Sequence, residues 1–239
     1  MGSNVWDRAK GASANESGFD RGAALTRSLL GYGVLAGPFY LAVGLVQALV
    51  REGFDFSRHP LSVLANGPGG WVQTANFLLS GAMVLAAAVG FARALRPHSR
   101  AAGWILGCFG LSMVVAAIFR ADPVDGFPVG TAPGVPTSVS TTGMLHFAAG
   151  GIGFLALTVS CFVVAVALSR RKERAMARIS FLCGAAAAAG FFGPVAFSSS
   201  TNGIAGIWLG VVVGFAWLAL TSLHLYRTSP DPNCAPGRS

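Results

Sequence analysis

The sequence predicts an all-α fold: a polytopic integral membrane protein in which a six-helix transmembrane bundle carries two longer external loops. Composition is the first observation, because 53% of the 239 residues are hydrophobic and only 11% are charged, whereas about a quarter of a soluble domain is charged. The second is that the apolar residues gather in six stretches, each close to the roughly 20 helical residues that cross a hydrocarbon core. Runs such as residues 184–190 are apolar on every side, which excludes the alternating pattern of a transmembrane barrel.

The membrane domain is expected to occupy residues 28–226. It lies between an N-terminal tail at 1–27 and a C-terminal tail at 227–239, both expected to be disordered. The N-terminal tail lacks the apolar core of a cleavable signal peptide, so the first span is expected to act as its own targeting signal. The six spans are expected at residues 28–50, 72–95, 101–119, 142–169, 179–197 and 204–226.

The first three spans each contain a feature that bears on helix packing. The first carries Pro38, which favours a kink because proline removes a backbone donor. The second opens with the polar residues Gln73 and Asn76 near its external end, and the third places Gly103 and Gly107 four residues apart. Small residues at this spacing share one helix face and let helices approach closely in lipid, where hydrophobic burial drives little association.

The last three spans continue this pattern. The fourth has His146 about one turn from its start, the fifth carries Pro194 as a second expected kink, and the sixth repeats glycine at Gly206, Gly210 and Gly214. The glycine faces favour compact packing within one chain, with a homo-oligomer as the alternative. No span has an Asp, Glu, Lys or Arg near its middle, which disfavours an ion-coupled transporter.

Charge sets the expected orientation. Of the 17 basic residues, 14 lie in the two tails and in the second and fourth connections, whereas only Arg51, Arg58 and Arg120 lie in the first, third and fifth. Basic residues are retained on the cytoplasmic side, so both termini are expected to be cytoplasmic. The net charge of +8 is clustered beside the spans without a nucleic-acid-binding motif, so the bilayer is the expected partner and nucleic acid is not.

The first and third connections are the places where chemistry is expected. Each has about 20 residues, long for a connection between neighbouring spans, and apolar residues such as Phe54 and Phe127 indicate that they fold as a cap over the helix ends. Most ionisable residues outside the cytoplasm fall here or just inside the neighbouring spans. The candidate external polar cluster consists of Asp55, Arg58, His59, Ser62, Asn76, Arg120, Asp122, Asp125 and His146.

The chemistry of this cluster has three interpretations. The favoured one is structural: His146 hydrogen-bonds a loop carboxylate, and Asp122 or Asp125 pairs with Arg58 or Arg120. The second is a zinc site with His59, His146 and Asp122 or Asp125 as its three ligands, although no paired-histidine motif is present. The third is a Ser57 or Ser62 nucleophile with His59 as base, which the closeness of these residues in sequence disfavours.

Three separated motifs in the same order resemble the family called domain of unknown function 998. They are the run His59-Pro60-Leu61-Ser62 with Trp71, Gln73, Asn76, Phe77 and Gly81; then Phe119, Asp122, Pro123, Gly126 and Pro128; and then Gly143, Leu145 and His146. The resemblance covers roughly residues 28–226 and implies a six-span bacterial membrane protein without an assigned activity. A more distant similarity, to seven-span zinc hydrolases of the alkaline ceramidase and adiponectin-receptor type, lacks their seventh span and third histidine.

The sequence therefore favours a membrane protein without catalysis of its own, whose external cap binds a partner or a lipid head group, and with no cofactor. A metal-dependent hydrolase acting on lipid at the outer leaflet is one alternative, and a small-solute transporter using the kinked spans is another. The expected location is the plasma membrane of a bacterium, because 15 of the 17 basic residues are Arg and the chain is rich in Ala and Gly. No protein partner is identified.

Overall fold

The structure, a computed structural model, describes residues 19–134, 136, 138–197 and 200–233, without the side chains of residues 194–202. Within this part of the chain, six helices are long and apolar enough to cross a membrane, which confirms the predicted six-helix membrane bundle. The helices, with a short 3-10 turn η1 before the second of them, are α2 (Arg21–Val50), η1 (Leu61–Ala65), α3 (Gly70–Ala94), α4 (Ala101–Ile118), α5 (Thr141–Arg170), α6 (Arg174–Phe197) and α7 (Ser200–Thr228).

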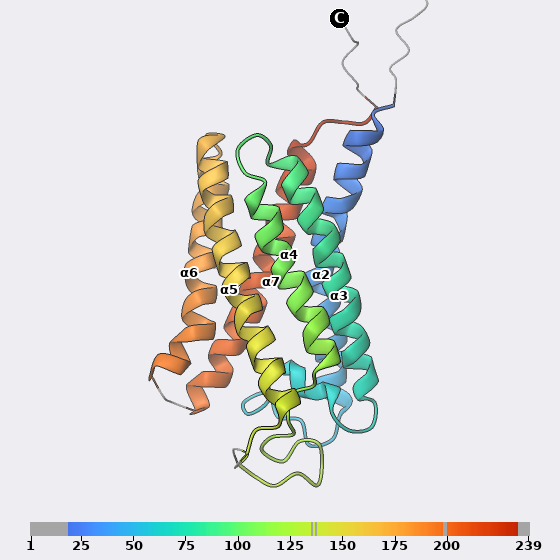
Figure 1. Ribbon diagram of the computed structural model, residues 1–239, viewed down its shortest axis with the longest axis vertical. Helices are drawn as coiled ribbons and strands as arrows, with labels where there is room; N and C mark the ends of the chain where they lie inside the picture. The colour runs from blue at the N-terminus through green and yellow to red at the C-terminus, as the bar shows by residue number, and fades with distance from the viewer. Residues whose placement is uncertain (1–18, 135, 137, 198–199, 234–239) are drawn as a thin grey trace, which may run out of the picture.

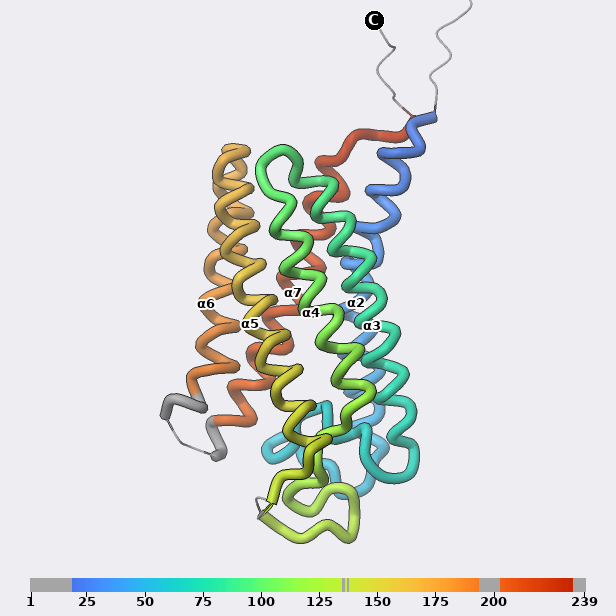
Figure 2. Tube along the Cα trace, in the orientation of Figure 1, coloured from blue at the N-terminus to red at the C-terminus, as the bar shows by residue number. Residues whose placement is uncertain are grey.

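The helices run up and down in chain order and form a closed ring. Each packs mainly against the next one in sequence, and α7 packs against α2 to close the ring, whereas α3 and α5 touch α7 only weakly. We call the side on which α2 begins and α7 ends the terminal face, and the side with the two long connections the loop face; they lie at the top and bottom of Figure 1. The tube in Figure 2 traces the same order from blue to red.

At the terminal face, the first helix begins earlier in the chain than the sequence predicted. Helix α2 begins at Arg21, so residues 21–27, expected to belong to the tail, form its first two turns. The Asp20 carboxylate starts the helix by accepting hydrogen bonds from the backbone N–H groups of Gly22 and Ala23. The backbone N–H of Asp20 also donates to the carbonyl of Pro232, 2.8 Å away. The two ends of the described chain are therefore joined.

Glycines allow the close helix contacts that the sequence predicts. A Cβ on Gly37 of α2 would lie 2.9 Å from the Cβ of Phe215 in α7, and a Cβ on Gly103 of α4 would overlap with the Ala88 carbonyl of α3. Contacts this tight admit only hydrogen at the α-carbon, so these helices pack backbone against backbone. Pro38 lies inside α2 as expected. The side chain of Pro194, the second expected kink, is outside the described part of the structure.

A chain of buried amides joins α2 to α3 in the loop-side half of the bundle. Gln47 donates to the Gln73 side-chain oxygen at 2.9 Å, and Asn76 donates both to that oxygen and to the Tyr40 carbonyl. One amide atom of each glutamine, Oε1 of Gln47 and Nε2 of Gln73, is buried without a hydrogen-bond partner among the described residues. Asn76 therefore bonds across helices as predicted, within a network that includes the glutamine pair.

Candidate functional site: a cavity beneath an interlocked cap

The two long connections touch one another and form a cap on the loop face, defined here as the described residues of 51–69, 119–134 and 138–140. The Asn66 side chain donates to the Ala121 carbonyl at 2.9 Å, and the rings of Phe54 and Phe127 meet edge to face with centroids 5.6 Å apart. Phe127 is 0% exposed. The predicted cap is thus a packed element in which the third connection inserts the aromatic side chain of Phe127 into the first connection.

His59 is the central polar link of the cap. Its Nδ1 accepts a hydrogen bond from the Asp55 backbone N–H at 2.9 Å, and its Nε2 lies 3.0 Å from the Asp125 carbonyl oxygen. The first bond places the ring proton on Nε2, which therefore donates to Asp125. The side chain is 0% exposed and lies against Phe54 and Phe127. Both ring nitrogens are occupied, so His59 has a structural role in this conformation.

Arg51 fixes the first connection from the end of α2. Its guanidinium donates to the carbonyls of Leu64 at 3.1 Å and Asn66 at 2.7 Å, and lies over the Phe127 ring at 5.2 Å from the centroid. A planar fork of donors above an aromatic face is an arrangement that arginine provides and lysine does not. The sequence prediction did not include Arg51 among the candidate residues.

The charged residues of the cap pair partly as expected. Arg58 lies 3.1 Å from an Asp55 oxygen and 3.7 Å from an Asp125 oxygen, which agrees with the predicted pairing of Asp125. Hydrogen bonds from the Ser57 side chain and backbone, with a smaller contribution from Arg58, lower the pKa of Asp55 to about 2. Arg120 is exposed, and within the described chain it forms no ion pair with Asp122 or Asp125.

Asp122 takes no part in the predicted ion pair, which Asp125 forms with Arg58. Its carboxylate accepts hydrogen bonds from the Ser140 N–H and hydroxyl, and the Ser140 hydroxyl oxygen accepts from the Gly143 N–H at 3.0 Å. Ser140 is the N-cap of α5, so Asp122 orders the start of this helix and places a negative charge where the helix dipole favours one. The partners of Asp122 are a hydroxyl and a backbone N–H, both of Ser140.

His146 also differs from the prediction. The expected carboxylate partner is wrong, because Nδ1 lies 2.9 Å from the Phe119 carbonyl and 3.3 Å from the Ala116 carbonyl. These acceptors at the end of α4 hold the proton on Nδ1, which leaves Nε2 of the neutral ring as an acceptor. The three proposed metal ligands have separate partners, and the described chain contains no group of three His, Cys, Asp or Glu side chains placed to hold a metal ion.

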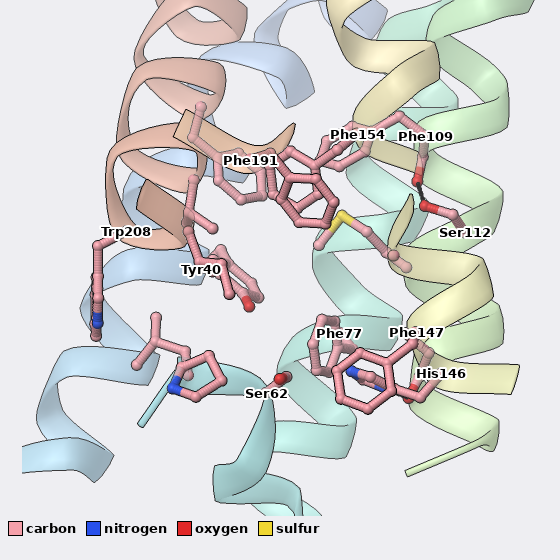
Figure 3. Close-up of a pocket in the computed structure, with 18 residues that line it drawn as sticks. Tyr40, Ser62, Phe77, Phe109, Ser112, His146, Phe147, Phe154, Phe191 and Trp208 are labelled. Carbon is pink, nitrogen blue, oxygen red and sulfur yellow. Dashed lines mark hydrogen bonds between the residues drawn. The ribbon is translucent and has the colours of Figure 1, made fainter. Parts of the chain in front are cut away.

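Beneath the cap, the ring of helices encloses a cavity of about 140 Å³. Every one of the six helices contributes to its wall. Figure 3 shows the aromatic side chains around the space, with His146, Phe77 and Phe147 along one edge beside Ser62 of the cap. The aromatic residues that line it are Tyr40, Phe77, Phe109, Phe147, Phe154, Phe191, Trp208 and Phe215.

The polar atoms of this cavity are few. Ser112 donates to the Phe109 carbonyl at 2.7 Å. Together with Nε2 of His146 and the hydroxyl of Ser62, the wall offers a small number of polar groups in an otherwise apolar space. This combination is typical of sites for small apolar or amphiphilic ligands.

The cavity reaches the outside of the bundle in the membrane-spanning region. Phe147, on its wall, is 63% exposed. Phe147 and Gly150 of α5 both line the cavity, and toward the loop face α6 and α7 diverge from α5 (Figure 1). The wall of the cavity is therefore open to the outside of the bundle at Phe147 of α5.

The sequence prediction identified Ser62 and His146 but did not identify the cavity. The sequence did contain a signal for the cavity. Every predicted span has at least one aromatic residue, and the aromatic residues that line the cavity come from all six helices. Helices that are apolar on all sides do not reveal which face points inward, so the aromatic residues could not be assigned to a common space.

Comparison with known proteins gives one match. A family model described as "Protein of unknown function (DUF998)" matches residues 34–225. This range contains the cap and all the cavity residues named above. No curated protein and no solved structure matches the chain.

Proposed function

Because the chain belongs to the DUF998 family, whose description assigns no activity, we propose a function from the cavity: the protein binds the apolar chain of a membrane lipid without transforming it. The single observation that carries this proposal is an aromatic cavity beneath the cap whose wall on α5 is exposed at Phe147, within the membrane-spanning part of the bundle. The volume of about 140 Å³ is close to that of an engineered cavity that holds benzene. It suits a chain segment rather than a whole lipid.

The polar groups support a ligand with a polar end. Nε2 of His146 is placed to accept a hydrogen bond, and the Ser62 hydroxyl lies on the same wall. In the cap, Asp55 and Asp125 pair with Arg58, and Asp122 is bonded to Ser140, which favours the cavity over the outer surface of the cap as the binding site. The lipid head group then lies at the membrane boundary of the loop face.

The proposal includes an orientation and a location. The terminal face carries most of the basic residues, so we place it in the cytoplasm and the cap outside, in keeping with the retention of basic residues on the cytoplasmic side. The bilayer is the proposed partner, and the plasma membrane of a bacterium is the proposed location, on the composition described above.

Two glycines of α5 provide a matched test of the cavity. Gly150 lines it, Gly151 does not, and a Cβ on either residue meets no atom within 4 Å. Gly150→Leu therefore fills the opening without a backbone clash, and Gly151→Leu adds the same side chain at the neighbouring position. Each variant and the wild type are placed in nanodiscs with phosphatidylglycerol that carries a diazirine at the end of one acyl chain.

After illumination, mass spectrometry maps the labelled residues. We expect label at cavity residues such as Met113 and Phe109 in the wild type and in Gly151→Leu, and loss of most of it in Gly150→Leu. Label confined to lipid-facing residues such as Leu155 in all three proteins contradicts lipid binding in the cavity. Label in the cavity that Gly150→Leu leaves intact contradicts the proposed entrance.

The two alternative functions have distinct signatures. A lipid hydrolase makes product and loses this turnover in His146→Ala, whereas a binder makes none. A transporter moves solute into proteoliposomes. The engagement of His59 and Asp122 by separate backbone and hydroxyl partners favours binding over the three-ligand metal chemistry that the hydrolase requires.

A further inference from the structure

A second pocket, of about 370 Å³, lies at the opposite end of the bundle. It is formed where the start of α2, the end of α3, the turn between α5 and α6, and the end of α7 meet on the terminal face. We call it the terminal pocket. Its polar wall includes Arg93, Arg96, Arg171, Asp20, Thr26 and Ser229.

The terminal pocket has an excess of positive charge. The Asp20 carboxylate accepts from the N–H groups of Gly22 and Ala23, and Arg171 is paired with Glu173 at 2.8 Å. Nearby, Arg27 lies 3.6 Å from Asp231. Within the described residues, Arg93 and Arg96 therefore have no carboxylate at ion-pair distance.

Neutral groups hold Arg93 in place. Its Nε donates to the Thr26 hydroxyl at 2.9 Å, and Nη2 donates to the Gly22 carbonyl at 3.1 Å. These bonds fix the plane of the guanidinium without cancelling its charge. Arg171 is similarly oriented, because its Nη1 donates to the Ala94 carbonyl at 3.2 Å. Preorientation reduces the entropy that an arginine loses when it binds an anion.

We propose that the terminal pocket binds the phosphate group of an anionic phospholipid from the leaflet at the terminal face. Phosphate oxygens accept the paired N–H donors that arginine presents. The pocket lies at the ends of membrane-spanning helices, where lipid head groups are found. Its position and charge make this site independent of the cavity under the cap, so either proposal can fail alone.

Arg96 supplies the sharpest variant. It is exposed and lines the pocket, and its side chain makes no hydrogen bond or ion pair with a described residue, so Arg96→Gln removes charge from the pocket without breaking a side-chain contact. Arg100 is the matched control, because it lies on the same connection, is exposed, and does not line the pocket. Arg100→Gln changes the net charge by the same amount on the same face.

Binding is measured on the detergent-purified full chain by the shift in thermal unfolding midpoint, titrated with dioctanoyl phosphatidic acid. Ligands that bind only the folded state raise this midpoint. We expect an apparent dissociation constant about tenfold weaker in Arg96→Gln and unchanged in Arg100→Gln, in keeping with a charge-assisted contact. Dioctanoyl phosphatidylcholine, whose choline is cationic, is expected to bind more weakly to the wild type.

Two results overturn the proposal. Equal weakening in both variants shows that the general charge of the face attracts the lipid, and equal binding of phosphatidylcholine shows that the pocket does not select an anion. A titration with inorganic phosphate distinguishes a lipid head group from a soluble phosphate compound as the ligand. Stabilisation by phosphate equal to that by phosphatidic acid overturns a lipid ligand in favour of a soluble phosphate compound.

Discussion

Gly143 leaves the space that the Asp122 carboxylate occupies, since a Cβ at residue 143 would overlap with Oδ2 and Cγ of Asp122. The contact joins the third connection, which holds Asp122, to the first turn of α5, one turn before His146. Gly143 thus helps to position the first turn of α5 and, with it, His146 on the wall of the cavity.

Gly143→Ala should therefore destabilise the protein. Displacing the carboxylate breaks its bonds to Ser140, and we expect a cost of about 1–3 kcal/mol, as for other overpacked sites. Gly150→Ala in the same helix meets open space and should be neutral or stabilising by up to about 1 kcal/mol, because alanine favours helix. Thermal unfolding in detergent compares the two, and an equal loss in both argues against the Asp122 contact as the cause.

His59→Ala should loosen the cap. The substitution leaves the Asp55 N–H and the Asp125 carbonyl without their partner, at a cost of about 1–3 kcal/mol for each group that stays buried. Hydrogen exchange at residues 55–59 and 124–127 should speed up, while exchange in the α4 interior stays unchanged. Protection that persists in the cap of this variant means that the aromatic contacts alone hold the two connections together.

The acid sensitivity of the cap should follow Asp55. The pKa of this carboxyl is lowered in the folded state to about 2, below its unfolded value of about 3.9. The contribution of Asp55 to stability is fully present above pH 4 and is lost as the pH falls through 2. Ser57→Ala removes one hydrogen bond to the carboxylate, so the pKa should rise toward 4. Carboxyl carbon chemical shifts measure both values, and identical titrations contradict the role of Ser57.

The glutamine pair should show strong coupling. Gln47→Leu alone leaves the Gln73 side chain buried with fewer partners and should cost about 1–3 kcal/mol, whereas replacing both glutamines by leucine should cost less than the sum of the single changes. The measurement is a double-mutant cycle, in which the free energies of unfolding of Gln47→Leu, Gln73→Leu and the double variant are compared with that of the wild type. Strict additivity shows that the two side chains act independently.

The membrane fold was predictable because span length and hydropathy are set by the thickness of the bilayer, so each predicted span overlaps a helix of the structure. Contacts between distant residues were harder to infer. Sequence spacing could not show that His146 points at backbone carbonyls of α4, since a carbonyl has no residue type to signal it. Arg51 was missed for the same reason, because its hydrogen-bond partners are the backbone of η1 and Asn66.

The closure of the ring between α7 and α2 makes the chain suited to circular permutation. Each helix neighbours its predecessor and successor in space as well as in sequence, and the hydrogen bond from Asp20 to Pro232 brings the two ends together at the remaining junction. A linker across these ends would complete a covalent circle that follows the path of the packing. New termini opened in the short turn between α3 and α4 would then give a circular permutant with the same neighbours around the ring.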